Sequence, residues 1–551
     1  MSKSDIERFE REDIELKQRR RLGGNVREFM EEDAFSLNKN ISREDYQTIN
    51  RNIDETECDL SDKEKEKRKR AIRLRFVRGR KIHRDILVAT YFFVALFLSI
   101  IGYLVYFQVS KSDEYIQSEY NAKRQSVYAN KYIRGNILSA DGKVLARTVS
   151  DKEGKEHRLY PYNNTYAHSV GYTGKGNTGV ESIANSYLLS SHINPIYQAR
   201  LELENKKIPA DNVITTLNNK IQQTAYKSLG DKKGAVIAME VKTGKILAMV
   251  SKPDYDPNKI TEIWDELVSD ESNSNLVNRA TQGLYPPGST FKTVMALEYY
   301  REYGEGTKKF SYKCDSTYEF MDDGKEHIIN CSKKTSHGKV DLNKAYAKSC
   351  NGAFAEIGQL LDIKKLRATC EELGYNSKID TQILSSKSKF SLTSEEATTW
   401  RVVQTSIGQD TTLTTPLLNL AITAAVANDG TIMTPYIIDR VETANGSILK
   451  TFSPKKFKKV MSQSEADFLG KLMRGVITNG TGGDAEGDSY SVAGKTGSAE
   501  WKKGEDTHAW FVGFAPYENP EIAVCVIAEN SGSGGGVAAP IAKKVFDAYF
   551  K

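Results

Sequence analysis

The feature that most constrains this chain is an uninterrupted apolar segment near its N-terminus. Ile86 to Phe107 is 22 residues long and contains no Asp, Glu, Lys, Arg or His. At 1.5 Å rise per residue, a helix of this length crosses a hydrocarbon core of roughly 30 Å. A cleaved signal peptide would have a shorter apolar core, a short basic leader and a small-residue cleavage site, which this sequence lacks. The segment predicts a single transmembrane helix over 86–107.

The charges before this segment predict its orientation. Residues 63–84 carry 12 basic and 2 acidic side chains, whereas residues 1–62 carry 11 basic and 17 acidic ones. Basic residues beside a transmembrane helix stay on the cytoplasmic side of the cell membrane. We therefore expect a charged cytoplasmic tail over 1–85, a single membrane pass, and export of everything after residue 107.

The exported part is long enough for two domains. The whole chain has 551 residues, 39% of them hydrophobic, and a net charge of +6 that is small for this length. This composition excludes collagen-like, wholly disordered and polytopic membrane proteins. It gives no support to nucleic-acid binding, so we expect no nucleic acid among the partners.

Two patterns follow one another after the apolar segment. Over 108–209, short apolar alternations are separated by turn signals, which predicts a small α+β domain. Over 210–551, strands are mixed with longer helices. We expect strands at 234–241, 245–250, 507–515 and 521–528, and helices at 217–229, 293–300 and 538–550. The architecture implied is α+β, with an antiparallel sheet flanked by terminal helices and a helical insert between its strands.

The segment Pro286-Pro287-Gly288-Ser289-Thr290-Phe291-Lys292 carries the first candidate catalytic residues. The prolines and glycine mark a helix start, so Ser289 is expected in the first helical turn. Lys292 follows three residues later on the same face, where an amine of lowered pKa can take the serine proton. The helix N-terminus favours the negative charge that develops on attack at a carbonyl. Ser-x-x-Lys alone is weak evidence, because 336–339, 386–389 and 453–456 also match it.

Two further motifs strengthen this interpretation. Ser349-Cys350-Asn351 begins 60 residues after Ser289, and Lys495-Thr496-Gly497 begins 146 residues after Ser349. Serine penicillin-recognising enzymes use this chain order. The first motif supplies a hydroxyl for proton relay and an amide for the substrate backbone. The second supplies a cation and a hydroxyl for a carboxylate, and its glycine lets an extended peptide lie close. Lys242-Thr243-Gly244 has the same letters, but it precedes the serine and is expected to form a hairpin turn.

With these motifs in order, the sequence resembles the class B penicillin-binding proteins, which are monofunctional peptidoglycan D,D-transpeptidases. The resemblance covers nearly everything after residue 107. It also includes Asn278-Arg279-Ala280-Thr281-Gln282-Gly283, Ser406-Ile407-Gly408-Gln409, Thr415-Pro416-Leu417, Ala427-Asn428-Asp429-Gly430, Asn479-Gly480-Thr481 and 492–500. Two positions depart from the family pattern without removing a functional group: Cys350 fills the variable place of Ser-x-Asn, and Ser498 replaces a more usual Thr.

The resemblance implies the penicillin-binding transpeptidase fold over 210–551, with a helical subdomain. Residues 108–209 resemble the family's N-terminal pedestal through Arg134-Gly135-Asn136-Ile137, Asp141-Gly142, Leu145-Ala146 and Gly179-Val180-Glu181. About 100 residues cannot hold a glycosyltransferase domain. The resemblance therefore implies a separate partner for glycan polymerisation, an integral-membrane polymerase of the shape, elongation, division and sporulation group.

The resemblance also implies a role for each motif. Ser289 would attack the penultimate D-Ala carbonyl of a stem peptide ending in D-Ala-D-Ala, and Lys292 would be the base. Ser349 would relay a proton to the leaving amine, and Asn351 would hold the amide of the acyl chain. β-Lactams would acylate the same serine, and the chemistry requires no cofactor.

The substrate carboxylate has its own set of implied ligands. These are Lys495, Thr496 and Ser498, with Gly497 beside the peptide. The main-chain amides of Ser289 and Ser498 would form the oxyanion hole.

Two other classes of function stay open. A β-lactam sensor or a β-lactamase would use the same serine chemistry, and a non-catalytic scaffold would only activate the polymerase. Labelling with a fluorescent penicillin separates a scaffold from an enzyme. Turnover of released drug separates a hydrolase from a transpeptidase.

A second candidate site lies in a turn-rich insert before Ser349. Cys314, Asp315, Cys331 and His337 fall within 24 residues and form a possible tetrahedral zinc set, with His327 and Cys350 as reserve ligands. A structural zinc would brace a loop that has little core. A disulfide between Cys314 and Cys331, or free thiols, are the alternatives, since no Cys-x-x-Cys pair is present.

Overall fold

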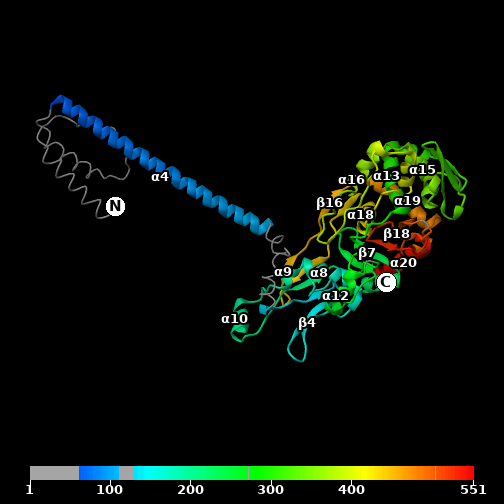
Figure 1. Ribbon diagram of the computed structural model, residues 1–551, viewed down its shortest axis with the longest axis horizontal. Coiled ribbons are helices and arrows are strands. Elements are labelled where there is room, and N and C mark those ends of the chain that lie inside the picture. Colours follow the sequence, from blue (N-terminus) through cyan, green and yellow to red (C-terminus); the bar gives the residue numbers. More distant parts are fainter. Residues whose placement is uncertain (1–60, 111–129, 271, 503) are drawn as a thin grey trace. The chain divides into compact units, whose positions relative to one another are not determined.

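The computed structural model describes residues 61–110, 130–270, 272–502 and 504–551. It divides into two units, 1–113 and 114–551, which are described separately (Figure 1). Most of the expected cytoplasmic tail, 1–60, lies outside the described residues. In the first unit, α4 (Asp62–Ser110) contains Asp85–Phe107, a stretch of 23 residues that is long and apolar enough to cross a membrane. This helix suggests a single-pass membrane anchor.

The second unit begins with a sheet in the order β15-β14-β6-β2-β3-β4. Its strands are β2 (Ile137–Leu138), β3 (Val144–Ser150), β4 (Glu156–Leu159), β6 (Asn212–Thr215), β14 (Ile438–Glu442) and β15 (Ile448–Thr451). Around it lie α7 (Ala167–Val170), α8 (Gly179–Ile183), α9 (Asn185–Leu188), α10 (Pro195–Leu203) and the parallel pair β1 (Tyr132–Ile133) and β5 (Ile208–Pro209). Because β14 and β15 come from the C-terminal half of the chain, this sheet joins residues on both sides of position 210.

A buried ion-pair group holds the pedestal together. Glu181 is fully buried and accepts hydrogen bonds from Nε of Arg134 and Nε of Arg158, each at 2.7 Å. Burial alone would raise the pKa of Glu181, but the two guanidinium groups outweigh it and hold this pKa below its usual value. The carboxylate therefore stays charged inside the fold.

The centre of the second unit is a five-stranded antiparallel sheet in the order β17-β18-β19-β7-β8. Its strands are β7 (Gly234–Glu240), β8 (Ile246–Lys252), β17 (Ala493–Ala499), β18 (His508–Ala515) and β19 (Ile522–Ala528). Every residue of β18 and β19 is buried, because helices cover both faces of the sheet. Strand β17 lies at the end of the order, and within the described ranges it pairs with β18 alone.

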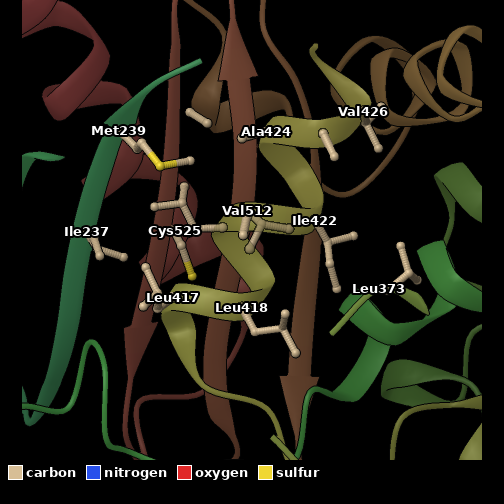
Figure 2. Close-up of a cluster of buried hydrophobic side chains, with 14 of the residues drawn as sticks. Ile237, Met239, Leu373, Leu417, Leu418, Ile422, Ala424, Val426, Val512 and Cys525 are labelled. Carbon is tan, nitrogen blue, oxygen red and sulfur yellow. The ribbon is translucent and has the colours of Figure 1, made fainter. Parts of the chain in front are cut away.

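The two faces of this sheet belong to separate apolar clusters. Side chains alternate along β7, so Val236 packs with α11 (Asn219–Leu229) and α20 (Ala539–Phe550), and Ile237 packs with α18 (Pro416–Val426). In Figure 2, α18 lies over the strands, with Leu417 beside Cys525 of the sheet and Ile422 on the other side of the helix, toward Leu373. All residues of α18 are buried. This two-sided burial fixes the sheet on which β17 lies.

The helical insert lies between β8 and β17 in the chain. Its helices are α12 (Ile260–Ser269), α13 (Lys292–Tyr303), α14 (Leu342–Ala347), α15 (Asn351–Leu360), α16 (Ile363–Glu372), α17 (Thr399–Ser406), α18 and α19 (Gln463–Asn479). Its short strands are β9 (Tyr312–Cys314), β10 (Thr317–Asp322), β11 (Lys325–Asn330), β12 (Gly338–Val340), β13 (Thr431–Met433) and β16 (Lys456–Lys459). The α+β architecture is confirmed, and the expected strands and helices are found to within a few residues at each end.

Candidate active site

Ser289 lies in a tight helical turn that leads into α13. The turn, η4 (Gly288–Phe291), begins at Gly288, whose φ is +53°. A Cβ at Gly288 would lie only 3.0 Å from Ser498 O, so this glycine lets the turn approach β17. The sequence placed Ser289 correctly in the first helical turn, and its side chain is partly exposed.

Lys292, the first residue of α13, is fully buried. Its Nζ donates hydrogen bonds to Ser349 O at 2.8 Å and Asn351 Oδ1 at 2.7 Å, and lies 3.3 Å from Ser349 Oγ. Burial lowers the pKa of Lys292 to about 8. A substantial fraction of the amine is therefore neutral near physiological pH and able to accept a proton.

Ser349 connects α14 to α15 in an unusual backbone conformation. Its φ is +56°, in the left-handed region that non-glycine residues rarely adopt. Ser349 N donates to Tyr346 O at 3.1 Å and Cys350 N donates to Ala345 O at 2.8 Å, which closes the turn. Asn351 Nδ2 donates to Asn330 O at 2.7 Å. These bonds hold both outer residues of the Ser-x-Asn motif in place.

Lys495 reaches the same place from β17. Its Nζ donates to Ser349 Oγ at 3.0 Å and to Thr496 O at 3.0 Å. Lys495 is fully buried, and its pKa lies well below the usual value because of burial and the nearby Lys292 charge. Farther along β17, Ser498 is exposed. The structure thus brings all three motifs together, whereas Lys242-Thr243-Gly244 forms the β7–β8 turn, as expected.

The second candidate site is a cluster of three thiols and one imidazole. The ligand atoms of Cys314, Cys331, His337 and Cys350 all lie within 4.8 Å of one another. Cys331 Sγ is 3.7 Å from Cys314 Sγ and 3.8 Å from Cys350 Sγ, and Cys314 Sγ is 3.4 Å from His337 Nδ1. The thiols are not joined by a disulfide. This cluster could hold a metal ion.

The structure changes one member of the expected ligand set. Asp315 is exposed, pairs with Lys313 at 3.3 Å and lies outside the cluster. Its place is taken by Cys350, which had been a reserve ligand. The other reserve ligand, His327, stacks on Phe320 and packs at a tilt against Trp400 instead. Asp315 follows β9 into a turn, so adjacency to Cys314 in sequence does not bring its carboxylate to the thiols.

One residue near the site was not singled out as functional from the sequence. With its amide oxygen and nitrogen assigned from the groups they face, the Gln409 carboxamide donates to Glu500 O and accepts from Glu500 N, both at 3.0 Å. Gln409 belongs to a segment that supported the family resemblance, but nothing in the sequence indicates its partner 91 residues later.

Comparison with known proteins supports the resemblance to penicillin-binding proteins. Residues 234–547 match the penicillin binding protein transpeptidase domain, and residues 134–210 match the penicillin binding protein A dimerisation domain. The peptidoglycan D,D-transpeptidase PbpA of Mycolicibacterium smegmatis is 32% identical over 463 residues, which cover 76% of this chain and 90% of that protein. The peptidoglycan D,D-transpeptidase MrdA of Acinetobacter baumannii is 29% identical over 446 residues, which cover 71% of this chain and 65% of that protein.

A solved structure agrees with these sequence matches. Penicillin-binding protein A from M. tuberculosis, determined as an imipenem acyl-enzyme complex, superposes with a TM-score of 0.70 at 29% identity, over 77% of this chain and 99% of that chain. The chain therefore belongs to the penicillin-binding protein transpeptidases, as a class B member with a dimerisation domain and a transpeptidase domain.

Proposed function

We propose that this protein cross-links peptidoglycan by D,D-transpeptidation, with Ser289 as the nucleophile that forms an acyl-enzyme. The observation that carries the proposal is the convergence of two buried amines on one hydroxyl, since Lys292 and Lys495 both contact Ser349 Oγ. A buried amine gives up its proton more readily than an exposed one. Lys292, three residues after Ser289, is therefore suited to be the base.

In the acylation step, Ser289 Oγ bonds to the carbonyl carbon of the penultimate D-Ala. Lys292 takes the serine proton, and the main-chain N–H groups of Ser289 and Ser498 stabilise the oxyanion. The amide bond to the terminal D-Ala then breaks. Lys292 gives the proton it took to Ser349, and Ser349 passes its own proton to the departing nitrogen, so the terminal D-Ala leaves as an amine and both residues regain their starting states.

Substrate binding uses the unpaired edge of β17. An extended stem peptide adds to this edge as a further strand. Gly497 instead leaves room for the Ser289 turn, because a Cβ there would lie 3.2 Å from Thr290 Cγ2 and 3.3 Å from Pro287 O. Lys495, Thr496 and Ser498 bind the terminal carboxylate, while the Asn351 amide holds the acyl chain. In the second step, an amine from a neighbouring stem peptide attacks the acyl carbonyl, forms the cross-link and releases the Ser289 hydroxyl.

The test uses the full-length protein in detergent with a fluorescent penicillin. We expect one stable adduct on the peptide that contains Ser289. A pentapeptide ending in D-Ala-D-Ala, supplied with a labelled D-amino acid as the amine, should exchange its terminal residue. Rapid release of hydrolysed penicillin would instead indicate a β-lactamase, and a slowly released adduct without exchange would indicate a sensor. The absence of any adduct would indicate a scaffold.

We also propose that Cys314, Cys331, His337 and Cys350 bind a structural zinc ion. Two thiolates at about 2.3 Å from one tetrahedral ion lie about 3.8 Å apart, which matches the sulfur separations of 3.7 and 3.8 Å. The Cys350 thiol and the main-chain N–H groups of Gly352 and Asn351 lower the pKa of Cys331, which favours a thiolate at Cys331, while the same hydrogen bond raises the pKa of Cys350, so zinc would have to displace the Cys350 proton. Disulfide and free-thiol states are the alternatives.

Elemental analysis of the purified protein tests the zinc proposal. About one zinc per chain, lost in Cys331→Ser, supports it. The matched control is Cys525→Ser, since Cys525 lies in the central sheet away from the cluster and its loss should leave the zinc content unchanged. Metal-free protein with Cys314 and Cys331 recovered in one linked peptide would eliminate the site.

The remaining parts of the chain fit a membrane-anchored enzyme that works with a partner. We propose a cytoplasmic tail over 1–85, a membrane pass over 86–107, a pedestal over 108–209 and a transpeptidase domain over 210–551. The partner class is an integral-membrane glycan polymerase, because a cross-linking enzyme needs a source of new strands. Co-purification of a polymerase with the full chain, lost when 86–107 is replaced by an unrelated transmembrane segment, tests this.

A further inference from the structure

The C-terminal turn of α17 contacts the elements that carry all three active-site motifs. On one side, α17 packs against α15, the helix that begins at Asn351. The approach is close, because a Cβ at Gly358 of α15 would lie 1.8 Å from Ser406 Oγ of α17. Ser406 Oγ in turn donates to Val402 O at 2.6 Å within α17. The helix after the Ser-x-Asn motif is therefore fixed against α17.

The next residues of the turn contact the Ser289 loop. Gly408 O accepts a hydrogen bond from Gly288 N at 2.9 Å. Gly408 has a φ of +78°, and a Cβ there would lie 1.9 Å from Gly288 O, so only glycine fits. The residue just before the Ser289 amide is thus held by main-chain contact with the turn.

Gln409 reaches the third motif. Its carboxamide forms two hydrogen bonds with the main chain of Glu500, both at 3.0 Å, just after the end of β17. A carboxamide that satisfies both N–H and C=O of one residue substitutes for a neighbouring strand at that position. It holds Glu500, two residues after Ser498, at a fixed separation from Gly288.

The turn itself is rigid. Gly408 N donates to Thr405 O and Gln409 N donates to Gln404 O, both at 2.9 Å, which closes the helix end. On the far side, Arg401 pairs with Asp410 at 3.1 Å, and Asp410 has a φ of +60°. A turn fixed in this way keeps the motifs that it contacts at constant distances from one another.

We propose that Gln409 is a positioning residue for acylation, which holds the end of β17 so that the amides of Ser289 and Ser498 face the same oxyanion. Gln409 would act through the Glu500 backbone, next to the reacting groups. This inference rests on the proposed function of Ser289, because it concerns the geometry of that acylation step. Misplaced oxyanion donors slow the chemical step more than they weaken binding.

Two variants separate hydrogen bonding from packing. Gln409→Met keeps the length of the side chain but removes both hydrogen bonds. Gln409→Glu keeps an acceptor for Glu500 N but places a second carboxylate oxygen against Glu500 O, where the parent has a donor. Protonation of the introduced carboxyl restores that donor, so this variant has a built-in rescue at low pH.

The measurement is acylation of the full-length protein by a fluorescent penicillin, resolved into the dissociation constant of the initial complex and the first-order acylation rate. At pH 7.5, both variants should lose about tenfold or more in acylation rate with less than a threefold change in the dissociation constant. As the pH falls to 5, the ratio of the Gln409→Glu rate to the parent rate should rise towards one. The ratio for Gln409→Met should stay low at every pH.

Gln463→Glu and Gln463→Met are the matched controls, because Gln463 is exposed at the start of α19. Melting temperatures are recorded for all variants. Parental acylation rates in both Gln409 variants would overturn the inference. A loss without acid rescue that follows a lowered melting temperature would overturn it too, by assigning Gln409 a purely structural role. No acylation of the parent protein would overturn the proposed function, and this inference with it.

Discussion

Lys292 and Lys495 direct their amines at one atom, the Oγ of Ser349, from distances of 3.3 and 3.0 Å. The two residues come from different elements, α13 and β17, and both are fully buried. Among the described residues, neither has a carboxylate as an ion-pair partner. Two like charges this close in a buried site are unfavourable, so at least one amine tends to be neutral. The hydroxyl between them is placed to pass a proton.

The first prediction follows from the lowered pKa of Lys292. With a pKa of about 8, the neutral amine that accepts the Ser289 proton falls about tenfold for each pH unit below that value. The acylation rate with penicillin should therefore rise from pH 6 to 8 and then level off. Stopped-flow acylation at constant ionic strength measures this. A rate that is flat between pH 6 and 8 would contradict Lys292 as the base.

The second prediction concerns the nucleophile. Ser289→Ala should abolish covalent penicillin labelling, because the neighbouring hydroxyls of Thr290 and Thr293 are buried and hydrogen-bonded to Pro287 O and the Tyr346 hydroxyl. The melting temperature should change little, since Ser289 is partly exposed and the lost hydroxyl is small. The control variant Thr293→Ala tests whether the loss of a neighbouring hydroxyl also abolishes penicillin labelling. A covalent adduct that persists on Ser289→Ala would remove Ser289 from its role.

The third prediction concerns metal removal. If zinc joins the thiol cluster, a strong chelator should lower the melting temperature of the protein by about 5 °C or more, because bound metal stabilises only the folded state. Zinc added back should restore it. Because Cys350 lies between Ser349 and Asn351, penicillin acylation should slow in the same samples. Equal melting temperatures with and without chelator would speak against a structural metal.

The fourth prediction concerns membrane topology. Protease added outside intact protoplasts or spheroplasts should digest residues beyond Phe107 and spare residues 1–85, given the basic surplus from Lys63 to Arg84. Antibodies to tags at the two ends of the chain report the fragments. Protection of the C-terminal part would reverse the proposed orientation.

The fifth prediction concerns the pedestal. Glu181→Ala leaves the mostly covered side chains of Arg134 and Arg158 without their shared carboxylate, so the free energy of unfolding should fall by about 3–5 kcal/mol. Urea unfolding followed by circular dichroism measures this. Glu204→Ala is the control, because Glu204 also bonds two basic residues but at the surface, where the change should be slight. Equal unfolding curves for Glu181→Ala and the parent would refute the prediction.

Local signals accounted for much of the fold. The Pro-Pro-Gly sequence before Ser289 predicted a helix start, and the turn at Lys242-Thr243-Gly244 predicted the β7–β8 hairpin. Both depend on residues close together in the chain, where turn and capping preferences act. The apolar strands at the end of the chain were equally clear, because burial on both faces requires continuous apolar sequence.

Long-range pairings could not be predicted in this way. Cys350, at the start of α15, reaches Cys331 because α15 packs against β9 and β11, whereas spacing favoured Asp315, the neighbour of Cys314. Gln409 and Glu500 are brought together by the packing of α17 against the active-site elements. Such contacts depend on the whole fold, and a single sequence carries no local signal for them. The roles of the motif residues remain predictions.

The open edge of β17 has a consequence for how this protein can change over evolutionary time. An edge offers main-chain N–H and C=O groups, and these stay the same for every encoded amino acid except proline, which lacks the N–H. A mutation to any other amino acid therefore cannot delete the part of the surface that an antibiotic and the natural peptide would share. Mutation can instead alter the position of the strand, by changing side chains that fix the segments beside it. Trp510 is one such side chain, because its Nε1 donates to Pro286 O at 3.1 Å. Inherited drug tolerance in this chain should accordingly arise from substitutions that shift the strand.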